Sequence, residues 1–131
     1  MENYNVETKK SRAGIILIVL GIFAGLIIAI VIACSTFISQ HSFSTAQWEQ
    51  YPNERTKIVD DLLMRYDLIG MQESEILALL GNHDNDSGYF SSENRFVYRL
   101  GMERGFISID SEWLIIDFDD GIVTGYFITT D

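Results

Sequence analysis

The side chains suited to chemistry are few, and two of them adjoin in one polar segment. His83 and Asp84 stand side by side within residues 82–94, whose Asn, Asp, Ser and Gly content is typical of a loop. A histidine beside an aspartate suits a metal site or a pH-sensitive pair. The simpler interpretation, which we adopt, is a histidine on a surface loop.

The same segment invites comparison with a calcium-binding loop. Asp84, Asp86 and Gly88 follow one another at short spacing. The calcium template needs acidic or polar ligands at its first, third and fifth positions, glycine at the sixth and glutamate at the twelfth. Counted from Asp84, those last two positions hold Tyr89 and Arg95. We therefore expect no metal site.

Other catalytic patterns are missing from the sequence. It has one cysteine, which allows no cysteine-based zinc site, and two histidines, both in polar segments, which form no metal cluster and no Ser-His-Asp set. No glycine-rich phosphate loop is present, and the many carboxylates show no spacing that would hold a pair in one cleft. We expect the protein not to be an enzyme and to bind no cofactor.

The one cysteine, Cys34, directly follows the most informative stretch of the chain. Gly14–Ala33 contains twenty residues without a charge, which as a helix span about 30 Å, the thickness of the hydrocarbon layer of a membrane. Either this stretch is a retained transmembrane helix, or it is a signal peptide cleaved before a lipid-carrying Cys34. The length favours retention. The Val31–Cys34 sequence favours the lipoprotein, although Ile32 is bulky for a lipobox.

Small residues recur every fourth position along the apolar stretch. Such a stripe lets two membrane helices approach closely. If the helix is retained, it predicts a homodimer contact through Gly21, Gly25, Ala29 and Ala33.

Charge is distributed unevenly about the apolar stretch. Three basic residues, Lys9, Lys10 and Arg12, precede it, whereas 17 acidic and six basic residues follow Cys34. Basic residues flanking a membrane segment stay in the cytoplasm, so the C-terminal domain is expected outside it. An acidic domain also argues against binding nucleic acid or anionic lipid.

We therefore expect a protein of the cell membrane with a single anchor and a cytoplasmic N-terminus. The predicted parts are an unstructured cytoplasmic tail (1–13), the transmembrane helix or signal region (14–38), a polar connector (39–53) and an extracytoplasmic α+β domain (54–131).

The domain is predicted to begin with two helices. In Glu54–Tyr66 the apolar residues fall on one stripe at helical spacing. A second helix is expected over Gln72–Leu80, with acidic residues near its N-terminus and Gly81 as its stop. From Arg95 onward the period changes to two, which predicts four strands, at Phe96–Leu100, Phe106–Ile109, Trp113–Phe118 and Ile122–Thr129.

Asp120-Gly121 predicts a tight hairpin turn that pairs Asp119 with Ile122. Strict alternation then assigns one apolar face, packed under the helices, to Leu114, Ile116, Phe118, Val123 and Phe127. The opposite face mixes apolar and polar side chains. We expect it either to be a partner surface or to be covered by the connector through Phe43 or Trp48, and its large apolar residues are Trp113, Ile115, Tyr126 and Ile128.

Two segments resemble a known family. The sequences Leu68–Met71, Glu75-Ile76 and Leu79–Gly81 look like the helix signature of the SmpA/OmlA (BamE-type) envelope lipoproteins, and Arg104–Phe106 through Ser111–Leu114 is similar to related small Firmicutes proteins. His83 departs from the proline usual in that family. The resemblance implies a two-layer domain of two helices on a three- or four-stranded antiparallel sheet, tethered outside a membrane and acting by protein contact.

These observations lead to a function of binding without catalysis. We expect a membrane-tethered scaffolding or binding module of the bacterial envelope. Two alternatives stay open: an inhibitor-like domain that binds an enzyme through its sheet, and a regulator of a neighbouring membrane protein that acts through the small-residue stripe.

Overall fold

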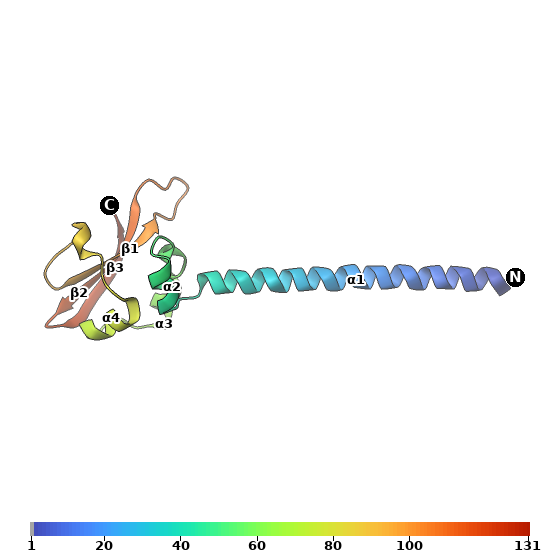
Figure 1. Ribbon diagram of the computed structural model, residues 1–131, viewed down its shortest axis with the longest axis horizontal. Coiled ribbons are helices and arrows are strands. Elements are labelled where there is room, and N and C mark those ends of the chain that lie inside the picture. Colours follow the sequence, from blue (N-terminus) through green and yellow to red (C-terminus); the bar gives the residue numbers. More distant parts are fainter. Residues whose placement is uncertain (1) are drawn as a thin grey trace. The chain divides into compact units, whose positions relative to one another are not determined.

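The computed structural model describes residues 2–131, which divide into two compact units (Figure 1). The first unit ends at Ser39, and the second comprises Gln40–Asp131.

The described part of the first unit is helical and belongs to one helix, α1 (Glu2–His41), whose last two residues are in the second unit. Its segment Ser11–His41 has a mean hydropathy of 3.4, and no residue of its most apolar window is buried. It is long and apolar enough to cross a membrane, a property that a signal sequence shares. The prediction of an unstructured tail was wrong, because α1 already begins at Glu2. Met1 lies outside the described residues.

The second unit is an α+β domain, as predicted. Short helices precede a three-stranded sheet; the elements are α2 (Thr45–Gln50), η1 (Arg55–Lys57), α3 (Val59–Arg65), α4 (Glu73–Leu80), η2 (Asn85–Ser87), β1 (Arg95–Met102), β2 (Ser111–Asp119) and β3 (Ile122–Thr130).

The sheet is antiparallel in the order β1-β2-β3. The predicted strand at Phe106–Ile109 does not form. Met102 already pairs with Ser111, so the residues between β1 and β2 form their connection. Figure 1 shows this connection projecting beyond the sheet.

The second predicted helix is confirmed as α4. Gln72 and Glu75 form a reciprocal capping box at its start, and Gly81, at φ +70°, ends it. The first predicted helix is shorter than expected. A 3-10 turn over Arg55–Lys57 precedes α3, which starts only at Val59.

Residues predicted to be a connector belong to the domain core. Phe43 is 4% exposed, and Trp48 on α2 is fully buried. Their rings pack edge-to-face at 5.9 Å, and the Trp48 ring lies 6.0 Å from that of Tyr98 on β1. These residues therefore cover the helix-side face of the sheet. We had considered them as a cover for the opposite face, which carries Trp113 and Ile115.

A bulge in β3 corrects the predicted register. Phe118 pairs with Val123, but Asp117 pairs with Gly125, so Thr124 is an extra residue. One extra residue turns all following side chains to the opposite face. Tyr126 therefore pairs with Ile116 and packs on the helix-side core, as does Ile128, whereas Phe127 points to the other face.

The four residues proposed as one partner surface are thus divided between two faces. On the face away from the helices, Trp113 is 3% exposed and Ile115 is fully buried. The loop 82–94 covers them: Phe90 packs against this cluster, and the Tyr89 ring stacks on Trp113 at 5.5 Å.

A substitution at Gly101 can test how closely the predicted connector, residues 39–53, packs on β1. It has φ +131°, and a Cβ atom there would lie 2.2 Å from the Asn53 carbonyl oxygen. We expect Gly101→Ala to lower the free energy of unfolding by about 2 kcal/mol or more. A Cβ atom at Gly105 meets nothing within 4 Å, so Gly105→Ala is the control and should change it by less than about 0.5 kcal/mol.

Both variants are measured by denaturant unfolding in neutral detergent, followed by emission of the buried Trp48 and Trp113. Equal stability of the two variants would contradict the close packing.

Candidate functional site

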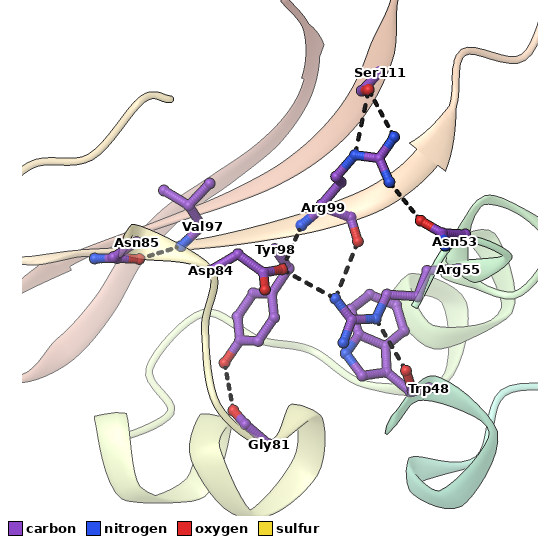
Figure 2. A network of polar contacts seen from close by, with 10 residues as sticks. All are labelled: Trp48, Asn53, Arg55, Gly81, Asp84, Asn85, Val97, Tyr98, Arg99 and Ser111. Carbon is purple, nitrogen blue, oxygen red and sulfur yellow. Dashed lines mark hydrogen bonds and ion pairs between the residues drawn. The ribbon is translucent and has the colours of Figure 1, made fainter. Parts of the chain in front are cut away.

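The most connected polar cluster surrounds Arg55, which is 5% exposed (Figure 2). Its Nε donates to the Trp48 carbonyl at 3.0 Å, and its Nη1 donates to the Arg99 carbonyl at 3.0 Å and to the Asp84 carboxylate at 3.2 Å. The guanidinium carbon also lies 4.8 Å from the centre of the Trp48 ring. Arg55 therefore joins α2, the loop 82–94 and β1.

Electrostatics in this cluster indicate structure, not reactivity. Burial lowers the pKa of Arg55, while the Asp84 carboxylate raises it. Burial raises the pKa of Tyr98, which keeps its hydroxyl protonated to donate to the Gly81 carbonyl at 3.0 Å. Neither shift brings a group into the range where it would exchange protons near neutral pH.

The candidate metal residues are used to hold the loop 82–94 against β1. Besides Arg55, Asp84 accepts the Arg99 backbone N–H at 2.9 Å, and Asn85 accepts that of Val97 at 2.9 Å. His83 stacks on Phe96 with ring centres 4.4 Å apart. No group of three or more metal-ligating side chains occurs among residues 2–131 as far as they are described.

A second charged cluster sits at the base of the β1–β2 connection. Arg104 forms ion pairs with Glu112 at 3.0 Å and with Asp60 at 2.7 Å. Burial opposes the charge on Arg104, but its hydrogen bonds to Glu112 and Asp60 leave the pKa raised. The negative charge of Glu112, which is 6% exposed, is thus compensated by the charge of Arg104. Sequence reasoning missed this cluster because Asp60 is 44 positions from Arg104 in the chain and the three residues follow no motif.

A shallow, open depression lies beside the β2–β3 turn. It is lined by the start of α4 and by the turn, including Glu73, Ser74, Asp120 and Ile122. Two carboxylates reach its rim, but the described lining offers no histidine, cysteine or basic group to pair with them. The depression has no arrangement for acid–base or nucleophilic chemistry.

Part of β3 is open to further strand pairing. Val123 exchanges backbone hydrogen bonds with the segment before α4: its N–H donates to the Met71 carbonyl at 2.8 Å, and its carbonyl accepts from the Gly70 N–H at 2.9 Å. This segment therefore covers the first residues of β3. Residues 125–130, which we call the β3 edge, pair within the sheet with β2 alone. Phe127, one of these residues, is 45% exposed, and the Arg95 guanidinium lies 5.8 Å from its ring.

A second exposed feature is the β1–β2 loop, residues 103–110. Three of its apolar side chains are largely exposed: Phe106 fully, Ile107 to 70% and Ile109 to 77%. The sequence signal was this apolar run, which we had interpreted as a strand.

The candidate residues on α1 are exposed. Added Cβ atoms at Gly21 and Gly25 meet nothing within 4 Å, and Ala29 and Ala33 are exposed on the same helix. Cys34 is a free, exposed thiol.

No family model, curated protein or solved structure matches this chain.

The structural role of Asp84 is directly testable. Asp84→Asn leaves the buried Arg55 guanidinium without its charged partner, and breaking a buried ion pair costs about 3–5 kcal/mol. Because the Asp84 side chain is 40% exposed, we expect a smaller loss of unfolding free energy, about 2 kcal/mol.

Asp86→Asn, an exposed position in the same loop, is the matched control. Denaturant unfolding of both variants decides the matter. An equal effect at the two positions would show that the Arg55 pair does not stabilise the loop.

Proposed function

We propose that the protein is a membrane-tethered, non-catalytic module of the bacterial cell envelope that binds a protein partner outside the cytoplasm. The observation that carries this proposal is the division of the chain. The helix α1, in which no residue of the most apolar window is buried, is followed by a separate unit with its own core. Water does not favour the exposure of such a helix, whereas a membrane does.

The apolar segment provides a membrane tether whether it is retained or cleaved. A retained α1 anchors the domain directly, and a cleaved segment leaves Cys34 as the lipid-bearing residue. The basic residues Lys9, Lys10 and Arg12 favour a cytoplasmic N-terminus and an outward domain. The resemblance to the SmpA/OmlA lipoproteins supports the same location, and the α+β fold with a capped α4 at the signature agrees with it.

The absence of catalysis is part of the proposal. The polar clusters around Arg55 and Arg104 are satisfied by internal ion pairs, and the described depression lacks paired acid and base groups.

We assign the partner contact to the β3 edge. An unpaired strand edge accepts an extended segment of another protein through backbone hydrogen bonds, and Phe127 adds an exposed aromatic contact beside it. This assignment also limits where the sheet of an inhibitor-like domain could bind an enzyme. The loop 82–94 covers Trp113 and Ile115, whereas Phe127 on β3 stays exposed.

A photocrosslinker at Thr129, on the β3 edge, tests the assignment in cells of the native host. We expect a discrete adduct with one protein, reduced about tenfold by Phe127→Glu because a carboxylate replaces the aromatic contact. Met64→Glu is the matched control, since Met64 is 79% exposed on α3. Absence of an adduct, or equal loss with both substitutions, would count against the β3 edge.

The same adduct distinguishes tethered binding from regulation through α1. Residues 14–31 are exchanged for an unrelated apolar stretch of equal length, keeping Ile32–Cys34. Tethered binding predicts an unchanged adduct. Regulation through the small-residue stripe of Gly21, Gly25 and Ala29 predicts its loss.

A further inference from the structure

The tip of the β1–β2 loop is built to present apolar side chains outward. At its base, the Glu103 N–H donates to the Asp110 carbonyl at 2.9 Å, and the Ser108 hydroxyl donates to the Glu103 carbonyl at 2.7 Å. These bonds close the loop, and its tip Phe106–Ile109 carries no charge. Phe106 is fully exposed, which is costly in water for a side chain of this size.

Charges at the base of the loop restrict what the tip can meet. Arg104 is neutralised by Glu112 and Asp60, so the unpaired charges flanking the tip are the carboxylates of Glu103 and Asp110. A strongly anionic surface would therefore repel the loop.

The tether keeps this tip close to a membrane. Nine positions separate Cys34 from Phe43, the first residue of the domain core, so even a fully extended link spans only about 30 Å. This bound holds for a retained α1 and for a lipid on Cys34 alike. A domain of this size has a radius of gyration of about 12 Å, so rotation about the link brings its loops to the bilayer surface.

We propose that Phe106, Ile107 and Ile109 insert into the interfacial layer of the membrane to which the protein is tethered, at a surface of neutral lipid. The side chains reach the boundary of the acyl chains, while the loop backbone stays among the headgroups, where water satisfies its polar groups. This inference rests on the proposed function, because it requires the tether. It adds that the loop determines which side of the domain faces the membrane, so that the β3 edge stays accessible to a partner.

Quenching by brominated lipid tests this insertion. The full chain carrying Ile107→Trp is reconstituted into phosphatidylcholine vesicles with bromine on the acyl chains. Met64→Trp is the control, because it places an equally exposed indole on α3. Trp48 and Trp113 are buried and give both variants the same background.

We expect brominated lipid to quench the emission added by Ile107→Trp about twofold more strongly than the emission added by Met64→Trp. Phe106→Ser in the Ile107→Trp variant should diminish the difference, as should phosphatidylglycerol at low salt. Equal quenching at both positions would overturn the proposal. So would a blue-shifted Ile107→Trp emission without bromine quenching, which would indicate a protein contact.

Sedimentation with the vesicles distinguishes a failure of the tether from a failure of the loop to insert. A chain that does not sediment with them contradicts the proposed function. A chain that sediments without differential quenching contradicts only the insertion of the loop.

Discussion

The packing of Trp48 against β1 is the contact on which the rest of the domain depends. It brings the residues just after α1 onto the helix-side face of the sheet, next to Tyr98. Arg55 lies on the same indole and reaches Asp84, so one buried tryptophan and one buried guanidinium hold α2, the loop 82–94 and β1 together. Because this core starts at Phe43, only a short link separates it from Cys34. If the protein is tethered as we propose, this short link keeps the domain close to the membrane.

Features governed by local chemistry were predictable from the sequence. The capped α4, the Asp120-Gly121 turn and the exposed apolar length of α1 each depend on residues within one element. For the same reason the class of fold, α+β with an antiparallel sheet, was predictable. The candidate site was less so: His83 and Asp84 were noted as adjacent, but their use in fixing a loop depends on Phe96 and Arg55, which are distant in sequence.

The remaining differences arise from long-range packing. Alternation alone does not reveal the extra residue at Thr124, although Gly125 beside it is a residue that often marks a bulge. Because of this one residue, Tyr126 and Ile128 face the helices and Phe127 faces away from them, the reverse of what alternation predicts. Likewise, Tyr89 and Phe90 lie in a segment of loop composition, and only the anchoring of that loop on β1 places them over Trp113. Ile107 and Ile109 alternate with Ser108 as in a strand, yet these residues lie in the connection between β1 and β2 and are exposed.

We propose one task for each exposed feature: α1 or a lipid on Cys34 would hold the protein at the membrane, the β1–β2 loop would orient the domain, and the β3 edge would bind a partner. The first two tasks require that the protein be tethered to a membrane. The most direct test is the intact mass of the protein, measured separately in washed membranes and in the soluble fraction. The account predicts membrane-bound protein that either retains residues 1–33 or begins at a lipid-modified Cys34. Soluble protein that has lost those residues and carries an unmodified Cys34 would contradict it.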